Sequence, residues 1–248
     1  MVLSVPRMGE YVDATFSKNP SLFKSGVFLW SYLSSNSRER IYLYTMSEKQ
    51  KLPIMEMFYS LQGEGFHSGK PAFFIRLAGC DVGCVWCDVK ESWNAGDHEE
   101  LSIDHIISEV EKAKADFVVI TGGEPAMYDL NNLTNQLHNI GCYIAIETSG
   151  AYELNGTFDW VCLSPKKFKP PTISNYKLAQ ELKVIVLNKH DLSWCEEQRS
   201  LVKNKDCKFF LQPEWDKQEI MLPLIIDYVK SNTMWQVSLQ THKYMNIP

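Results

Sequence analysis

From Pro71 to the end of the chain, short apolar runs rich in β-branched residues alternate with longer amphipathic stretches. This alternation is typical of repeated βα units around a parallel sheet. The predicted strands are Ala72–Leu77, Phe117–Thr121, Tyr143–Glu147, Trp160–Ser164, Leu182–Val186, Lys208–Gln212 and Gln236–Leu239. Because six or seven strands are too few for a closed eightfold barrel, the sequence predicts an α/β fold with a partial barrel of the (βα)6 type in a single domain.

Helices are predicted in the stretches between these strands. Ser102 can cap a helix whose first turn carries Asp104, where a negative charge is favourable. The apolar face of this helix comprises Ile103, Ile106, Ile107, Val110 and Ala113. Further helices are predicted over residues 129–140 and 223–230, and Pro223 suits a first helical turn better than a helix interior.

The composition favours one catalytic domain that acts on a small molecule. The 248 residues, 45% of them hydrophobic, can bury one sizeable core. The formal net charge of −5 and the pI near 5.7 provide no broad basic field for a nucleic-acid backbone. No stretch approaches the ~20 apolar residues of a membrane-spanning helix, since the nearest candidate, Val27–Leu33, is short and contains Ser31. We therefore expect neither a nucleic acid nor a membrane as a partner.

Residues 1–45 carry no helical or strand periodicity and no motif. Glu10 and Asp13 interrupt the start, which argues against a signal peptide. Two interpretations are open for this segment: a disordered leader, or sequence upstream of a translation start at Met46. The catalytic domain is accordingly predicted over residues 46–248.

The seven cysteines are an odd number, and three of them fall within eight positions. This arrangement indicates metal ligation in a reducing compartment rather than a disulfide framework, so a cytoplasmic location is expected. Cys80, Cys84 and Cys87 have C-x3-C-x2-C spacing, which lets one loop wrap a single cluster. Three ligands for four irons leave one iron open, where S-adenosylmethionine (SAM) can chelate, whereas a purely electron-carrying cluster is normally closed by a fourth cysteine.

A structural zinc site is the alternative interpretation of these thiolates. Zinc would need a fourth donor, but the remaining cysteines lie in or beside apolar runs where buried, inert cysteine is expected. They are Cys142, Cys162, Cys195 and Cys207.

Polar clusters follow four of the predicted strands. They are Thr121–Pro125, Glu147–Gly150, Ser164–Lys166 and Gln212–Glu214. In parallel sheets, ligands bind at the carboxyl ends of the strands, so all four clusters are expected at one rim.

The cysteine loop directly after the first of the predicted strands, followed by Gly122-Gly123-Glu124-Pro125 after the second, resembles the radical SAM superfamily. From Pro53 to the last residue, the chain more narrowly resembles the 7-carboxy-7-deazaguanine synthase family. The matching blocks are Glu56–Gly65, Phe74–Leu77, Val119–Pro125, Ile146–Gly150, Ser164–Lys166 and Gln240–Tyr244. The resemblance implies conversion of 6-carboxy-5,6,7,8-tetrahydropterin to 7-carboxy-7-deazaguanine with loss of ammonia, on the route to queuosine. It also implies an external one-electron donor of the flavodoxin or ferredoxin type, and a homodimer.

The resemblance assigns roles to individual residues. A [4Fe-4S] cluster is expected on Cys80, Cys84 and Cys87. SAM is expected to contact Trp86, Asp88, Gly122, Gly123, Glu124, Ser164, Pro165, Lys166, Gln212 and Pro213. The pterin is expected to contact Leu61, Gln62, Gly63, Arg76, Thr121 and Pro248.

Two positions leave alternatives open. Arg76 interrupts an apolar strand, so it either forms a structural ion pair or binds the substrate carboxylate through its planar fork. Val89 stands where many members of the family carry a threonine that helps to bind magnesium. Valine offers no oxygen ligand, so the sequence puts a magnesium requirement in doubt.

Two rival functions share parts of this pattern. A glycyl-radical activase has the same cysteine spacing but acts on a protein, and the Leu61–Gly65 and Gln240–Tyr244 blocks argue against it. A noncatalytic iron–sulfur protein would not need an open iron or the Gly122–Pro125 block.

Overall fold

The structure is a computed structural model that describes residues 27–32, 40–45 and 50–248. The chain divides into two compact units, Met1–Gln50 and Lys51–Pro248. In the first unit, strands β1 (Val27–Tyr32) and β2 (Arg40–Thr45) form an antiparallel pair. The sequence of residues 1–45 shows no strand periodicity, so neither of these two strands was predicted. The rest of the expected leader, and the start proposed at Met46, lie outside the described residues.

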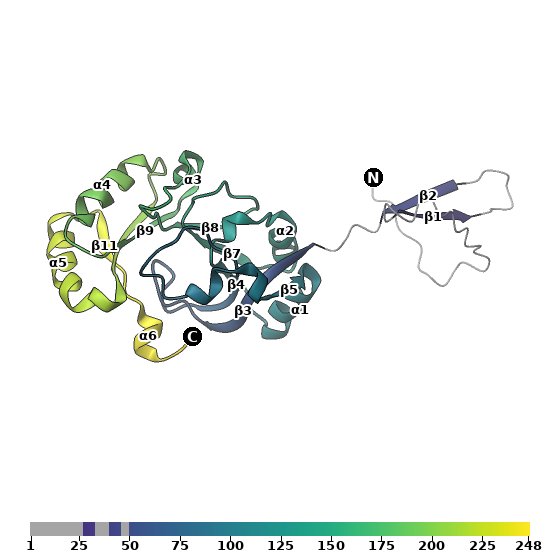
Figure 1. The fold of residues 1–248 in the computed structure, drawn as a ribbon, viewed down its shortest axis with the longest axis horizontal. Helices are drawn as coiled ribbons and strands as arrows, with labels where there is room; N and C mark the ends of the chain where they lie inside the picture. Colours follow the sequence, from purple (N-terminus) through teal and green to yellow (C-terminus); the bar gives the residue numbers. More distant parts are fainter. Residues whose placement is uncertain (1–26, 33–39, 46–49) are drawn as a thin grey trace. The chain divides into compact units, whose positions relative to one another are not determined.

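The second unit is built on a nine-stranded sheet in the order β11-β10-β9-β8-β7-β6-β4-β3-β5. The strands are β3 (Lys51–Leu61), β4 (Pro71–Leu77), β5 (Glu99–Ser102), β6 (Phe117–Gly122), β7 (Tyr143–Thr148), β8 (Trp160–Leu163), β9 (Glu181–Val186), β10 (Lys208–Pro213) and β11 (Trp235–Val237). The strands from β11 to β4 are parallel, whereas β3 runs antiparallel to both β4 and β5. The sheet curves without closing, which confirms the predicted partial barrel (Figure 1).

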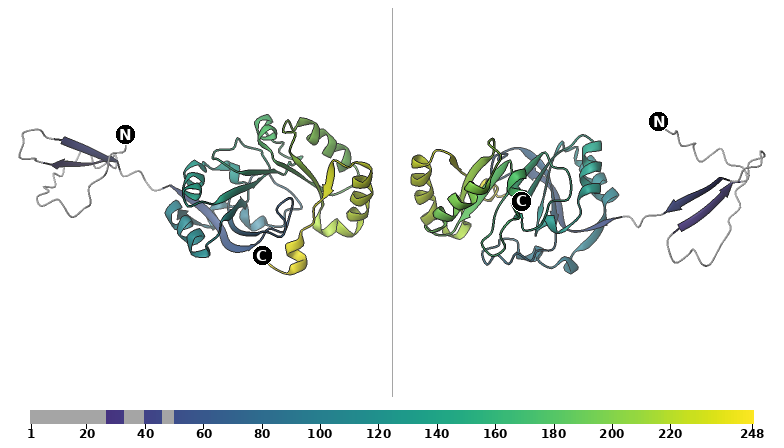
Figure 2. Two further views of the ribbon diagram at one scale, coloured as in Figure 1. Left: turned by 180° about the vertical axis from the view of Figure 1, so that it is seen from behind. Right: turned by 90° about the horizontal axis from the view of Figure 1, so that it is seen from above.

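Helices cover the outer face of the curved sheet, as the views from behind and from above also show (Figure 2). They are α1 (Ile103–Ala113), α2 (Asn131–Asn139), α3 (Ile173–Leu178), α4 (Asp191–Leu201) and α5 (Gln218–Ser231), and a short α6 (Thr241–Met245) follows β11. One-turn 3₁₀ helices are η2 (Lys90–Ser92), η3 (Ala95–Asp97), η4 (Pro125–Met127) and η5 (Trp215–Lys217). No helix in the described part of the chain is long and apolar enough to cross a membrane.

All seven predicted strands are present, with ends that shift by one or two residues. Ser102 caps α1 as predicted, accepting a hydrogen bond from the His105 backbone nitrogen. The prediction for Pro223 is wrong, because α5 begins at Gln218 and holds this proline inside the helix. Pro223 lacks the backbone N–H of an ordinary helical hydrogen bond. Burial of Met221 and Ile225 against the sheet nevertheless favours a helix that begins at Gln218 rather than at Pro223.

Apolar side chains form layers on both faces of the sheet. Outside, α1 and α2 pack on β4, β6 and β7, while α3, α4 and α5 pack on β8 to β11. Inside, a smaller cluster of Ala72, Phe74, Phe117, Val119 and Ala145 fills the barrel. Burial on both faces is the reason that these parallel strands are continuous apolar runs.

The amino ends of β6, β7 and β8 form a barrel floor that is covered by residues of the segment after β3. His67 from this segment is 7% exposed, and its ring contacts those of Phe117 and Trp160 at centroid distances of 5.0 and 4.7 Å. Burial, aided by the charge of Lys70, lowers the pKa of His67 from 6.5 to about 4.

We expect this histidine to make folding stability depend on pH. As the pH falls from 6.5 to about 4, His67 becomes protonated in the unfolded chain but stays neutral in the native protein. The free energy of unfolding therefore decreases over this range. A shift of this size corresponds to about 3 kcal/mol. His67→Phe keeps the aromatic packing and should remove this loss, measured as the free energy of unfolding in urea from neutral pH to about pH 4. Tyr143→Phe, in the same aromatic cluster, is the control and should leave the pH dependence unchanged.

Candidate active site

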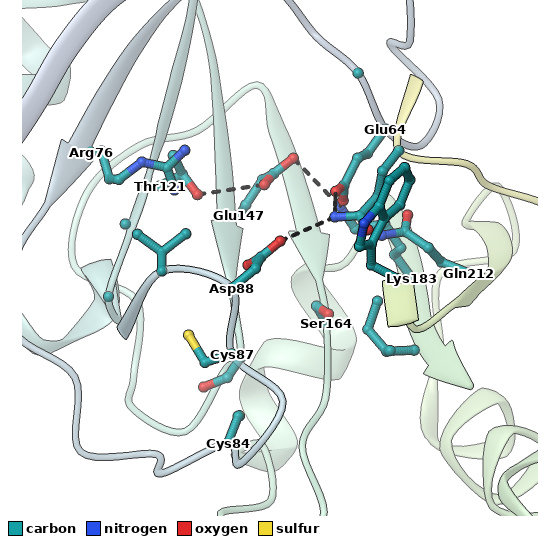
Figure 3. A pocket seen from close by; sticks show the side chains of 18 of the residues that line it. Glu64, Arg76, Cys84, Cys87, Asp88, Thr121, Glu147, Ser164, Lys183 and Gln212 are labelled. Atoms are coloured by element: carbon teal, nitrogen blue, oxygen red, sulfur yellow. Dashed lines mark hydrogen bonds and ion pairs between the residues drawn. The ribbon is translucent and has the colours of Figure 1, made fainter. Parts of the chain in front are cut away.

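A cavity of about 490 Å³ lies at the carboxyl ends of the parallel strands. Its volume is in the range of small-molecule sites. All of the residues predicted to contact the cluster, SAM or the pterin line this cavity, with the exception of Pro165. Pro165 is buried in the loop after β8 and does not form part of the wall. Figure 3 shows Cys84 and Cys87 on one side, with Asp88 between them and a group formed by Glu147, Lys183 and Glu64.

The three cysteines lie on the loop after β4. The backbone nitrogen of Gly79 donates to the Ser92 carbonyl (2.6 Å), and that of Cys80 donates to the Trp93 carbonyl (3.1 Å), so the loop is tied down at its start. Further along the loop, the Cys87 nitrogen donates to the Cys84 carbonyl (3.0 Å) and forms a turn. All three cysteines line the main cavity. A reaction there can therefore use whatever they bind.

The donor set fits a multi-iron cluster better than a single ion. In the described residues, no group of three or more His, Cys, Asp or Glu side chains converges on a point where one ion could sit. A four-iron cluster does not need such convergence, because each thiolate binds a different iron. The other four cysteines are buried. Cys142 belongs to the core under α1 and α2, and Cys162 lies within β8. Cys195, on α4, and Cys207 belong to the core that α4 and α5 cover, so none of the four supplies a fourth zinc ligand at the loop.

Gly122, the last residue of β6, and Gly123 after it allow the cysteine loop to lie directly against this strand. A Cβ atom at Gly122, where φ is +134°, would collide with the backbone of Leu77, and one at Gly123 would collide with the carbonyl of Gly79. The Gly123 nitrogen donates to the Leu77 carbonyl (2.9 Å), and the Glu124 nitrogen donates to the Gly79 carbonyl (2.8 Å). The glycines are therefore required by close backbone approach, whatever else they contact.

Glu124 is 1% exposed, and its carboxylate is used within the protein. One oxygen accepts from the Ala126 nitrogen (3.0 Å) and from the Thr148 hydroxyl, and the other accepts from the nitrogen (2.8 Å) and hydroxyl of Ser149. Glu124 thereby joins the turn after β6 to the end of β7. This arrangement makes it a residue that positions the cavity wall.

Arg76 forms an ion pair and still lines the cavity. Its Nε donates to Glu56 Oε1 at 2.6 Å, across the antiparallel pair of β4 and β3. The two terminal nitrogens of the guanidinium make no hydrogen bond or ion pair with the described residues. Arg76 is also the register partner of Thr121 on β6, and Figure 3 shows the two side chains side by side. The structural ion pair and substrate binding are thus compatible roles for Arg76. The ion pair with Glu56 fixes the side chain, and the two terminal nitrogens remain available for a substrate carboxylate.

A buried lysine, missed in the sequence, organises the wall opposite Arg76. Lys183 on β9 has a side chain that is 5% exposed, and its Nζ bonds to Glu64 and lies 3.6 Å from Glu147 Oε1. Glu147 also accepts from Gln62 Nε2 (3.0 Å) and Thr121 Oγ1 (3.4 Å). Burial alone would raise the pKa of Glu64, but the charge and hydrogen bond of Lys183 outweigh it and lower that pKa. Both carboxylates therefore face the cavity as hydrogen-bond acceptors.

The end of the chain folds back over the cavity. Lys243 Nζ donates to Asp88 Oδ2 (2.9 Å), and Gln240 Nε2 donates to the same oxygen (3.3 Å) and to Glu64 Oε1 (2.9 Å). The Ser60 hydroxyl donates to a main-chain oxygen of Pro248 (3.2 Å). The tail thus joins the cysteine loop to β3.

Lys166 and Gln212 form the remaining part of the wall. Lys166 Nζ donates to the carbonyl (2.7 Å) and hydroxyl (2.6 Å) of Ser164 and lies 5.4 Å from the centre of the Trp86 ring. Burial lowers the pKa of Lys166. Gln212 Oε1 accepts from Ser238 (2.7 Å). Lys166 is therefore no surface lysine, and it connects the loop after β8 to the cysteine loop.

The partial barrel and the three-cysteine loop define a radical SAM protein, and the model of the Radical SAM superfamily matches residues 74–156. The chain is 54% identical to 7-carboxy-7-deazaguanine synthase of Flavobacterium psychrophilum, over 80% of this chain and 94% of that protein. It is 37% identical to the synthase of Escherichia coli, over 79% of this chain and 98% of the relative. The crystal structure of QueE from Escherichia coli superposes with a TM-score of 0.69 at 32% identity and covers 77% of this chain and 95% of that chain. The chain belongs to the 7-carboxy-7-deazaguanine synthase family, as its sequence motifs indicate.

Proposed function

We propose that this protein converts 6-carboxy-5,6,7,8-tetrahydropterin to 7-carboxy-7-deazaguanine and ammonia as a radical SAM enzyme of queuosine biosynthesis. The observation that carries the proposal is one cavity that the three cysteines, Arg76 and the Glu147–Lys183–Glu64 group all line. The family relationship extends over nearly the whole length of the curated relatives, which supports the same activity.

Cys80, Cys84 and Cys87 would hold the [4Fe-4S] cluster. When bound, the cluster supplies the one-electron chemistry that cleaves SAM and starts hydrogen abstraction from the pterin. Eight residues that line the cavity would bind SAM: Trp86, Asp88, Gly122, Gly123, Ser164, Lys166, Gln212 and Pro213. Glu124 acts on this site by holding the turn in place.

The cavity residues away from the cysteine loop would bind the pterin. The terminal nitrogens of Arg76, which bond to none of the described residues, match a carboxylate in bidentate geometry. Acceptor oxygens of Glu64 and Glu147 match the N–H groups of an aminopyrimidine ring, and Gln62 and Thr121 fix the orientation of Glu147. Leu61, Gly63 and Pro248 complete the wall next to β3 and the tail. Because the tail covers the cavity, it would keep water away from the reacting substrate.

The substitution Arg76→Lys tests the carboxylate assignment. Lysine keeps the charge but lacks the fork, and losing one partner of a charged pair costs ~2–5 kcal/mol of binding. We expect pterin affinity to fall by at least about thirtyfold while SAM affinity is retained. The measurement is titration of both ligands against the cluster-loaded variant, with a thermal melt in parallel. An unchanged pterin affinity would falsify the assignment, and a matching loss of both ligands and of stability would show a purely structural ion pair.

Magnesium is expected to have a weak effect on turnover. Val89 lines the cavity without an oxygen ligand, and one oxygen of Asp88 is already bonded to Lys243 and Gln240. Val89→Thr adds a hydroxyl at this position and should increase the response of the rate to magnesium. Strong magnesium dependence of the unmodified enzyme would contradict this prediction. Val82→Thr, at another cavity position on the loop, is a matched control.

The reaction also needs an external one-electron donor of the flavodoxin or ferredoxin type, and a homodimer is the proposed assembly. The direct test of function is to incubate the reduced, reconstituted protein with SAM and the pterin, and to detect the deazaguanine product by mass spectrometry. SAM cleavage without this product would favour a different radical SAM activity, including a glycyl-radical activase. The absence of SAM cleavage would indicate an iron–sulfur protein without catalysis.

A further inference from the structure

A second cavity of about 10 Å³ lies at the barrel floor. Glu181, His67, Trp160 and Phe117 line it from the floor side. Gln62, Glu64 and Glu147 line both this cavity and the active-site cavity, so the two share a wall. The volume is that of a single species of about the size of water. We call this cavity the floor pocket.

Buried polar atoms in the floor pocket have no partner. Glu181 is 3% exposed, and its Oε2 accepts from Trp160 Nε1 (2.9 Å) and the Phe66 nitrogen (3.3 Å). Its Oε1 has no hydrogen-bond partner among the described residues, and neither has either ring nitrogen of His67. A carboxylate oxygen and an imidazole acceptor nitrogen are costly to bury without a donor, so Glu181 Oε1 and one ring nitrogen of His67 indicate a small ligand that donates hydrogen bonds.

The charges around the floor pocket favour a cation. Its lining includes the carboxylates of Glu64, Glu147 and Glu181, and no lysine or arginine is found among the described residues that line it. Lys183 lies nearby and forms its ion pairs with Glu64 and Glu147, although its charge also acts on Glu181. The charge of Lys70 acts on His67.

We infer that the floor pocket is a binding site for an ammonium ion. Ammonium is close to water in size and donates hydrogen bonds to a carboxylate oxygen and to the unprotonated nitrogen of a neutral imidazole, which matches Glu181 and His67. Hard metal cations prefer a full shell of oxygen ligands. Phe117, Trp160 and His67 occupy part of the lining and offer no oxygen atom, so the floor pocket does not provide such a shell. The identity of the cation rests on the proposed function, because that reaction releases one ammonia in the neighbouring cavity. The floor pocket would hold this product after it leaves the pterin.

The test is the thermal melting of the full-length protein at neutral pH in equal concentrations of ammonium chloride, sodium chloride or tetramethylammonium chloride. Ammonium should raise the melting temperature by about 2–4 °C over the other salts, and the effect should saturate. Glu181→Gln should remove the ammonium-specific rise, whereas Glu219→Gln, at an exposed carboxylate on α5, should keep it. Equal melting in all three salts, or an ammonium effect that survives Glu181→Gln, would overturn the inference.

His67→Phe gives a second readout if Glu181→Gln does not fold. This substitution removes an acceptor from the floor pocket. It should weaken ammonium binding, so that the half-saturating ammonium concentration rises by about tenfold. An unchanged value would count against the site. Formation of the deazaguanine product without any ammonium effect would refute this inference alone. An ammonium effect in a protein that forms no such product would refute the proposed function alone.

Discussion

Replacing Lys183 by methionine should lower the free energy of unfolding by about 3–5 kcal/mol at neutral pH. Methionine fills a similar volume, so the loss comes from charge: Glu64 and Glu147 keep their positions in the barrel without a cation between them. Removing one member of a buried ion pair is costly because the remaining charge stays buried and uncompensated. Urea unfolding measures the effect, and pterin affinity should fall with it because the two acceptors lose their orientation.

The pH dependence distinguishes this cause from a packing defect. In Lys183→Met the partly buried carboxylates of Glu64 and Glu147 can relieve their cost by protonation, so the deficit in stability should shrink as the pH is lowered. Glu64→Gln in the Lys183→Met background should recover part of the stability at neutral pH. Lys230→Met is the matched control, because the Lys230 side chain is 72% exposed and pairs with Asp227 at the surface. A Lys183→Met deficit that stays constant with pH would indicate lost packing instead.

The parallel part of the sheet could be predicted because burial on both faces leaves continuous apolar runs, as in the Phe117–Ile120 stretch of β6. The antiparallel strand β3 could not be predicted in this way, because Pro53, Glu56 and Ser60 interrupt its apolar residues. Glu56 pairs with Arg76, which lines the cavity, and Ser60 bonds to Pro248 at the chain end. Helix α4 was missed for a related reason: Asp191 and Gln198 are among its buried residues, so its inner face is not apolar in sequence.

The candidate site likewise contains residues that could be predicted from the sequence and residues that could not. Cys80, Cys84 and Cys87 and the glycines after β6 could be placed in one site because short spacing and strand order are visible in the sequence. Lys183 carried the signal used for Arg76, a charge inside an apolar strand, and could have been found by it. Its partner Glu64 is 119 residues away in the sequence. Strand register and barrel curvature bring the two together, and neither can be read from residue spacing.

Cys84→Ala should abolish both cluster binding and turnover. Cys84 is 8% exposed in the cysteine loop, and each thiolate of the loop would hold a separate iron, so two thiolates leave a second iron without a protein ligand. The fold should survive, since the loop is held by backbone bonds from Gly79 and Cys80 and by the glycines after β6. The measurements are iron and sulfide content after anaerobic reconstitution, the visible absorbance of the cluster, and product formation.

Cys195→Ala is the control that separates cluster loss from the loss of any thiol. Cys195 is buried in the core under α4, so its removal should lower stability modestly while iron content and turnover are retained. The zinc interpretation makes a different prediction, because a zinc site would require one of the buried core cysteines as its fourth ligand. Tight binding of one zinc by the unmodified protein, lost equally in Cys84→Ala and in a core variant, would sink the cluster assignment. Iron and sulfide in equal amounts, lost only in Cys84→Ala, would establish the three-thiolate site.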